Sequence, residues 1–188
     1  SALFSGYPDS ISGLTVNRFC SSSLDAINLG HLKIQSQQAD NVIAGGVEMM
    51  SRVPMLSDEA AIWNDIVLAA QAKIFLMGSG ADLIASLFNI SRDDVDIQAL
   101  KSQQRAANAQ RNNHFKSIIP VLNQDKSIHC VKDECIRLDT TIESLSSLDP
   151  SFKKLGEQGV DQAQLNLFPD LKEILHVHTA GNSPAMAD

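Results

Sequence analysis

The arrangement of the first 46 residues constrains the fold more than any other feature of the sequence. A short β-type run (14–16) gives way to a helical run (21–36), and a buried-strand pattern (41–46) follows and ends in two glycines. Apolar residues of the helical run recur at spacings of three and four and extend onto further faces, which is typical of a buried helix. This succession predicts a βαβ-like unit with a parallel or mixed sheet and a deeply buried helix.

A cysteine, Cys20, lies at the predicted turn between the first strand and the helix, directly before three serines. The first N–H groups of a helix are unpaired and its dipole is positive at that end, so a thiolate is stabilised there. The serine hydroxyls are potential N-caps of the helix. Cys20 is therefore a candidate nucleophile, and a buried structural cysteine is the alternative.

The composition indicates an ordinary soluble globular protein and excludes two classes of partner. The net charge of −7 argues against nucleic-acid binding, which favours a basic surplus, and no segment is long enough to span a membrane. The three cysteines form no even disulfide framework, so we expect reduced thiols and a cytoplasmic location. The sequence lacks a secretory signal and an initiator methionine, and we expect it to be part of a longer chain.

The middle of the chain is predicted to be mainly helical. A loosely patterned helix over 60–67 is followed by a glycine-flanked loop (77–80) and a helix over 81–88. A longer helix is predicted over 91–109, because a serine N-cap precedes it and an acidic residue lies three positions further on.

The last third of the chain alternates between strand and helix patterns. Two strands over 118–122 and 127–131 are joined by a polar turn, and a short helix is predicted over 140–148. The polar segment 153–159 is predicted to be a surface loop. The segment 174–180 is strand-like and breaks at a glycine.

Basic residues gather on the long helix and just after it, at Lys101, Arg105, Arg111, His114 and Lys116. On an acidic protein such a cluster could attract a phosphorylated ligand, but a solvated helix face is the favoured interpretation.

A metal site is not favoured. The residues that would form one are His129, Cys130, Cys135, His176 and His178. No closely spaced pair of CxxC elements occurs, so we predict no metal ligands.

Several ordered segments of the sequence resemble thiolases, the acyl-CoA acetyltransferases. The resemblance is carried by Thr15-Val-Asn-Arg-Phe-Cys-Ser-Ser22, Asn41-Val-Ile-Ala-Gly-Gly-Val-Glu-Met-Met-Ser-Arg-Val-Pro54, Met77-Gly78, Ala81-Asp-Leu-Ile-Ala85, Ser91-Arg-Asp-Asp94, Ser102-Gln-Gln-Arg-Ala-Ala107 and His176-Val-His-Thr-Ala-Gly-Asn-Ser183. It implies an α/β, thiolase-like fold that comprises part of the N-terminal layered core and the family's inserted α+β loop domain. The implied limits are 1–52 for the core part, 53–180 for the CoA-binding loop domain and 181–188 for the return towards the core.

The resemblance also implies roles for individual residues. Cys20 would accept the acyl group from an acyl-CoA, and Met77 would line the pantetheine tunnel. Phe152, Ala180 and Ser183 would line the rest of the CoA cleft. Coenzyme A would be a substrate, and no bound cofactor is implied.

The sequence departs from the family pattern at positions that bear on function. Ser23 stands where a glycine is usual after the nucleophile, and Pro184 replaces a serine that hydrogen-bonds CoA. The family's Gly-His-Pro histidine, its second active-site cysteine and its Asn-Glu-Ala-Phe segment do not occur in the 188 residues.

Two functions are therefore open. The first is acyl transfer between 3-ketoacyl-CoA or acetyl-CoA and CoA, as in fatty acid metabolism, with negligible turnover by these 188 residues alone. The alternative is a non-catalytic CoA-binding or subunit-interaction module. A decarboxylating ketosynthase of the same superfamily ranks last, because it does not explain the segment 77–107. Unpaired sheet edges and the resemblance both predict a homodimer.

Overall fold

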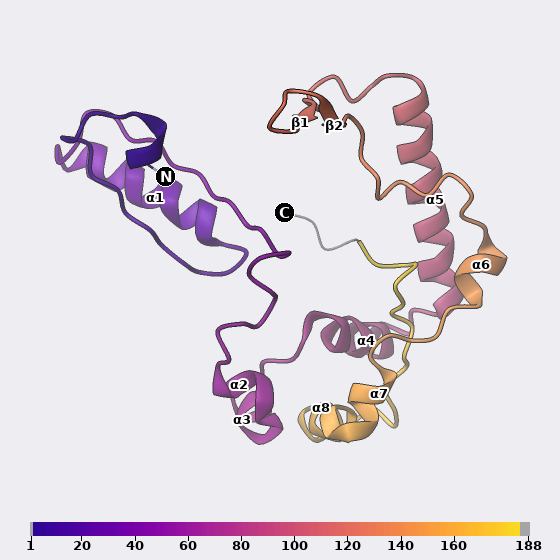
Figure 1. Ribbon diagram of the computed structural model, residues 1–188. Helices are drawn as coiled ribbons and strands as arrows, with labels where there is room; N and C mark the ends of the chain where they lie inside the picture. Colours follow the sequence, from indigo (N-terminus) through magenta and orange to yellow (C-terminus); the bar gives the residue numbers. More distant parts are fainter. Residues whose placement is uncertain (1, 185–188) are drawn as a thin grey trace. The chain divides into compact units, whose positions relative to one another are not determined.

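The computed structural model describes residues 2–184 and divides them into two compact units whose boundary lies between Met55 and Leu56 (Figure 1). No helix in the described part of the chain is long and apolar enough to cross a bilayer. The domain limits implied by the resemblance stay predictions, and residues 185–188 of the last predicted segment lie outside the described residues.

The first unit is built around helix α1 (Ser22–Gln35), which the sequence pattern predicted to within a residue. A short 3-10 helix, η1 (Leu3–Ser5), lies near the start of the chain. After α1 the chain runs back along the helix, and it approaches the helix closely at two glycines. A Cβ on Gly30 would lie 2.9 Å from Val42 Cγ1, and one on Gly46 would lie 2.5 Å from Ser23 Oγ.

The predicted parallel sheet of this unit is not formed in the described residues. Segments 14–16 and 41–46 have no ladder partner there, and 41–46 lies against α1 as an irregular segment. The two segments have side chains that are typical of β-strands. A strand forms, however, only when a second strand hydrogen-bonds to its backbone N–H and C=O groups.

The expectation of a deeply buried α1 is also wrong for this structure. Gly30 is its one buried residue, whereas Leu24 and Ile27 are 60% and 55% exposed. The irregular segment approaches one side of the helix, and the apolar side chains on its other faces stay exposed. The apolar pattern thus identifies surface that needs a partner to be buried.

The second unit consists of short helices around two longer ones and one hairpin (Figure 1). Its elements in chain order are α2 (Ala61–Asn64), α3 (Ile66–Gln71), α4 (Met77–Phe88), α5 (Arg92–Arg111), β1 (Val121–Leu122), β2 (Ile128–Cys130), α6 (Ile142–Ser146), α7 (Lys153–Leu155), the π-helical turn η2 (Gly156–Val160) and α8 (Asp161–Leu167). The described sheet is the antiparallel pair β1–β2, so the predicted hairpin is confirmed.

A local signal correctly marked the start of α5. Ser91 and Asp94 form the predicted capping box of α5. The loosely patterned helix over 60–67 is instead two helices, because Asp65 is extended and its carboxylate accepts hydrogen bonds from the N–H groups of Val67 and Leu68.

Three predicted loops or strands of this unit are different in the structure. Residues 77–80 form the first turn of α4 rather than a loop. Residues 153–158 are helical, and Gly159 interrupts the helix with a φ of 119°. Gly156 and Val160 are buried, and this burial outweighs the polar composition. Residues 174–180 are not paired with any described strand, and the N–H groups of Leu175, Val177 and His178 bond to side chains of α4 instead.

The core of the second unit lies where the segment 174–183 crosses α4, α5 and α6. Its buried apolar side chains are Leu83, Ala85, Ala107, Leu145, Val160, Ile174 and Val177. Helix α5 packs against α6, and α3 packs against α8. The largest fully buried side chains are nevertheless polar: Asp82, Asp96, Gln164 and Thr179. Buried polar groups of this kind need defined partners, which organise the site described next.

Candidate functional site

Cys20 lies two residues before α1 and is exposed, so the predicted turn position is confirmed. The residue before it, Phe19, has φ of 49°, a left-handed conformation that is uncommon for an aromatic residue. This sharp turn separates the chain before Cys20 from the helix. A free thiol is thus presented beside the first turn of a 14-residue helix.

The serines around Cys20 brace the turn rather than cap the helix. Ser21 occupies the N-cap position but makes no side-chain cap bond, which corrects the expectation. The Ser22 hydroxyl donates to the Phe19 carbonyl oxygen at 2.6 Å and accepts from the Arg18 N–H at 2.8 Å. The positive end of α1 therefore has no side-chain oxygen as a cap.

An ion pair fixes the two sides of this turn. Arg18 Nη1 lies 3.1 and 3.2 Å from the two Asp25 carboxylate oxygens. The Arg18 side chain is 70% exposed, so solvent screens the pair and its contribution to stability is small.

The predicted CoA-contact residues all belong to the second unit. Phe152 packs on the first turn of α4 at Gly78, next to Met77, where a Cβ would lie 2.1 Å from the ring. Its ring also meets His178 edge-on, with centroids 5.3 Å apart and planes at 71°. Met77 is 76% exposed beside this cluster.

His178 connects Phe152 to Ser183. His178 Nε2 lies 2.9 Å from Ser183 Oγ, and the same hydroxyl donates to the Thr179 carbonyl oxygen. A hydroxyl has one hydrogen, so the imidazole N–H must be the donor to Oγ. His178 therefore cannot act as a base towards Ser183 in this arrangement, and the pair holds the chain in position.

The turn 179–183 is closed by its own side chains. The Asn182 side chain accepts from the Thr179 N–H at 2.8 Å and donates to Asp96 and to the Val177 carbonyl oxygen. Thr179 Oγ1 accepts from the N–H of Gly181 at 3.2 Å. Ala180 is exposed at the tip. Three of the four predicted residues, Met77, Phe152 and Ser183, are thus linked through Gly78 and His178, and Ala180 lies on the same turn as Ser183.

Asp96 anchors this turn to α5 and α6. It is 1% exposed, and its Oδ2 lies 2.8 Å from Arg92 Nε. The Arg92 guanidinium also donates to the carbonyl oxygens of Leu145, in the last turn of α6, and of Leu148, just after that helix. The buried carboxylate is thus charge-paired and hydrogen-bonded, as burial of a charge requires.

Asp82 anchors the preceding residues to α4. Its carboxylate is fully buried, and Oδ1 accepts from the N–H groups of Val177 and His178 at 3.0 and 2.9 Å. Oδ2 lies 3.0 Å from His176 Nδ1, while His176 Nε2 lies 2.9 Å from Asp161 Oδ2. One histidine thus lies between a carboxylate of α4 and a carboxylate of α8.

The pKa of His176 is raised. Burial lowers it and is the largest single influence, but the hydrogen bonds to Asp82 and Asp161, together with their negative charges, outweigh burial. The imidazolium is therefore favoured beyond the ordinary range of a histidine.

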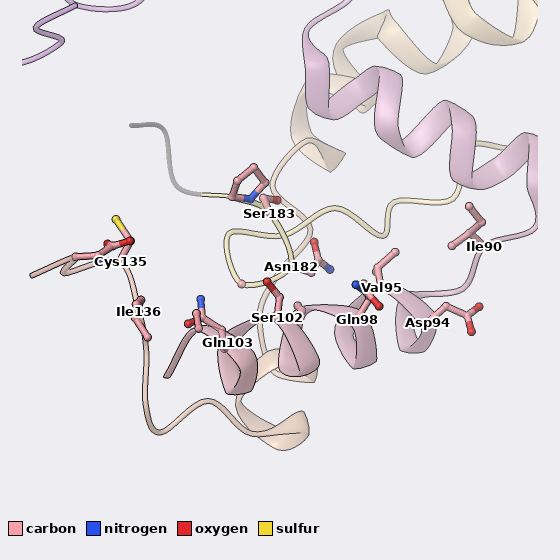
Figure 2. A pocket seen from close by; sticks show the side chains of 15 residues that line it. Ile90, Asp94, Val95, Gln98, Ser102, Gln103, Cys135, Ile136, Asn182 and Ser183 are labelled. Carbon is pink, nitrogen blue, oxygen red and sulfur yellow. Dashed lines mark hydrogen bonds between the residues drawn. The ribbon is translucent and has the colours of Figure 1, made fainter. Parts of the chain in front are cut away.

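A cavity of about 630 Å³ lies between α5, the segment 133–136 and the turn that carries Asn182 and Ser183. Figure 2 shows Gln98 and Ser102 of α5 beneath that turn, with Cys135 and Ile136 to one side. Its charged lining residues are Asp94 and Asp133, and no Lys, Arg or His lines it. This lining suits amide and hydroxyl groups better than phosphates.

Among the described residues, no group of three His, Cys, Asp or Glu side chains is placed to hold a metal ion. Around His176 the two carboxylates bond to opposite edges of the ring, so they do not converge on one point.

Sequence reasoning missed Asp82, Asp96, Asp161 and Asn182, and it considered His176 as a metal ligand only. One signal was present: Asp82 lies in an apolar helical run between Ser79 and Ser86, on the spacing of one face. A carboxylate on a buried helix face requires a hydrogen-bond donor, but the neighbouring sequence does not identify the residue that provides it.

Comparison with known proteins gives matches to thiolases over most of the chain. The family described as "Thiolase, N-terminal domain" matches residues 1–161. A β-ketoadipyl-CoA thiolase of Pseudomonas knackmussii is 38% identical over an alignment of 167 residues, which covers 79% of this chain and 42% of the relative. The 3-oxoadipyl-CoA/3-oxo-5,6-dehydrosuberyl-CoA thiolase of Escherichia coli is 36% identical, with coverage of 82% and 43%.

The crystal structure of the dimeric peroxisomal thiolase of Saccharomyces cerevisiae is similar in fold. The TM-score is 0.63 at 36% sequence identity, and the match covers 80% of this chain and 39% of that chain. The chain thus spans less than half the length of the relatives it matches. The predicted α/β, thiolase-like fold class is confirmed.

Proposed function

Because this chain belongs to the thiolase family, we propose that Cys20 is the nucleophile of an acyl transfer between 3-ketoacyl-CoA or acetyl-CoA and CoA. The observation that carries the proposal is the exposed thiol at the start of α1, within the segment that matches the family. The alternative, a buried structural cysteine, is not compatible with this exposure.

The proposed reaction has two steps. The Cys20 thiolate attacks the keto carbonyl of a 3-ketoacyl-CoA, the bond between C2 and C3 breaks, and the departing acetyl-CoA carbanion takes a proton. The thiol of a second CoA then gives up its proton, which balances the one taken by the carbanion, and its sulfur attacks the acyl–cysteine thioester. The bond between the acyl carbon and the Cys20 sulfur breaks, so acyl-CoA leaves and the Cys20 thiolate is restored. The positive end of α1 would favour the thiolate, and backbone N–H groups at this turn would stabilise the oxyanion.

We propose that Met77, Phe152, Ala180 and Ser183 contact CoA. The linkage of three of them through Gly78 and His178 supports this assignment, as does the position of Ser183 in the lining of the 630 Å³ cavity. The acceptor-rich lining would suit the amides and hydroxyl of the pantetheine arm, and the phosphates would lie outside it. CoA acts as a substrate in this proposal, and no other cofactor is required.

The 188 residues contain none of the acid–base motifs that the family resemblance calls for. General acid–base catalysis contributes about 10²–10⁴-fold to such rates, so we propose that these residues alone form an acyl-enzyme but turn over negligibly. The second candidate is a CoA-binding or subunit-interaction module without catalysis. The departures at Ser23 and Pro184 favour this second candidate.

We also propose a homodimer. The exposed apolar residues Leu24, Ile27 and Ile34 on one face of α1 support it, and the yeast relative is described as dimeric. Sedimentation equilibrium is expected to show a dimer, and a monomer at all concentrations would overturn this proposal. A cytoplasmic location remains our prediction from the unpaired cysteines.

The test of the nucleophile is covalent labelling. The chain is incubated with acetyl-CoA or acetoacetyl-CoA, and digested peptides are examined by mass spectrometry under conditions that preserve thioesters. We expect acylation on the peptide that contains Cys20, and none on those that contain Cys130 or Cys135. The Cys20→Ser variant should lose thioester labelling.

The outcomes separate the two candidates. Labelling of Cys20 without turnover supports the acyl-enzyme proposal for this chain. Saturable CoA binding without labelling of Cys20 supports the non-catalytic module. Robust acetoacetyl-CoA cleavage that Cys20→Ala abolishes would contradict the proposed lack of turnover.

A further inference from the structure

A chain of three ionisable side chains connects three separate elements of the second unit. Asp82 comes from α4, His176 from the segment before the turn 179–183, and Asp161 from the first residue of α8. The Asp82 side chain is 0% exposed and that of His176 is 13% exposed. These groups take no part in the proposed acyl transfer, and Asp82 bonds to the backbone of Val177 and His178, which precede the turn 179–183.

Both nitrogens of His176 face a carboxylate oxygen, at 3.0 and 2.9 Å. A neutral imidazole carries one N–H, so its second nitrogen would present a lone pair to an oxygen lone pair. The doubly protonated ring donates to both carboxylates, and such charge-assisted bonds are the stronger ones. The geometry therefore selects the imidazolium, and the direction of the His176 pKa shift agrees.

The bonds made by Asp82 extend directly to the turn. Asp82 Oδ1 accepts from the N–H groups of Val177 and His178, so one carboxylate holds the backbone that leads into residue 179. The His178 ring in turn contacts Ser183 and Phe152. The charge balance at Asp82 is thus linked through His178 to two proposed CoA contacts.

We propose that protonated His176 is the positioning residue for the turn 179–183, and that loss of its proton weakens CoA binding at Ala180 and Ser183. This inference rests on the CoA-binding role proposed above. His176 does not touch the reacting atoms, and it acts through Asp82 and the backbone of residues 177 and 178.

The consequence of deprotonation follows from the two carboxylates. A neutral His176 can donate to only one of them, and the proton passes to solvent. The Asp161 side chain is 27% exposed, so it can regain water when its bond is lost, whereas Asp82 cannot. We therefore expect α8 to separate from the segment 174–178 first, which would loosen the turn.

The charged groups around His176 are few. Asp82 from α4 and Asp161 from α8 contact the ring, and Glu173 and His178 are the nearest titratable residues along its own segment. Gly156 of η2 lies against Asp161, where an added Cβ would come 2.3 Å from Oδ1. The absence of a side chain at residue 156 leaves room for the Asp161 carboxylate.

The test combines a direct titration with ligand binding on the 188-residue chain. Nitrogen-15 NMR of the His176 ring is expected to show an imidazolium that persists above pH 6.5, the approximate ordinary pKa of a histidine. CoA binding is measured by calorimetry from pH 6 to 9. Affinity should fall as His176 loses its proton, and His176→Gln should remove that part of the pH dependence.

Two variants serve as references. Asp161→Asn keeps the shape but removes a charge, so the midpoint of both curves should move to lower pH. The exposed His114 serves as the control histidine. His114→Gln should keep the wild-type dependence of CoA affinity on pH, and any part of that dependence that comes from titration of CoA itself is the same in all variants. A His176 ring that loses its proton at or below the ordinary histidine pKa of about 6.5, or a CoA profile that His176→Gln leaves unchanged, would overturn the proposal.

Failure of the proposed function is distinguishable. If CoA does not bind at any pH, the amide hydrogen exchange of residues 177 and 178 decides the positioning role. Protection that is lost at the His176 midpoint, relative to amides of α5, supports positioning. Protection that does not follow this midpoint overturns it.

Discussion

Phe152 lies so close to Gly78 that a Cβ on the glycine would come within 2.1 Å of the aromatic ring. The two residues are 74 positions apart in the sequence, and the contact places the ring on the first turn of α4. Glycine normally weakens a helix, by about 1 kcal/mol relative to alanine. Here it provides the space that brings Phe152 beside Met77.

The Gly78→Ala variant tests this contact. Three ring carbons lie within 2.6 Å of the place that the alanine Cβ would occupy, so Phe152 must move, and overpacking of this kind costs about 1–3 kcal/mol. Urea denaturation should show this loss, and calorimetry should show weaker CoA binding. Gly80→Ala is the matched control, because a Cβ there meets nothing within 4 Å. Its stability should be unchanged or higher, and equal losses in the two variants would contradict the explanation.

The Asp82→Asn variant tests the buried carboxylate. Its oxygens accept from two backbone N–H groups and face His176, so an amide would lose the charge and could place a donor against donors. Removal of one partner from a buried charged pair costs about 3–5 kcal/mol. We expect the folded fraction at 25 °C to fall sharply in circular dichroism. Asp93→Asn, at an exposed position of α5, should be nearly neutral.

Stability should depend on pH through His176. Its pKa is raised in the folded chain, so the folded state binds the proton more tightly than the unfolded state does. This contribution is complete below the unfolded pKa of about 6.5 and is lost as the pH rises through the higher folded value. The free energy of unfolding from urea titrations should therefore fall as the pH rises from about 6.5 through the folded pKa of His176. His176→Gln should not show this fall, and a rise in stability with pH in the wild-type chain would contradict the assignment.

Several elements could be predicted because their signals are local. The capping box of Ser91 and Asp94 lies within four residues, and it correctly marked the start of the 20-residue helix α5. Helix α1 followed from apolar spacing, and the turn between β1 and β2 followed from polar residues between two apolar runs. Each of these structures is stabilised largely within its own segment.

Elements that depend on distant partners were predicted less well. The β-patterns at 14–16 and 41–46 describe suitable strands, but pairing requires a second backbone at a defined register. The helical start of α4 at Met77 was missed because Gly78 and Gly80 indicate a loop when considered alone. The ring of Phe152, which packs against Gly78 in this first turn, lies in another part of the sequence.

The sequence by itself determined the family of this protein, the helix that follows Cys20 and the position of the thiol at that helix's start. These depend on the order of residues and on interactions within a few positions. Only the tertiary structure decided that Asp82, Asp161 and His176 form one charged chain, since Asp82 and His176 are 94 positions apart. Their charges depend on one another because they are buried: in a low-dielectric interior, each charge is stable only when it is paired. No local sequence pattern identifies the residue that pairs with it.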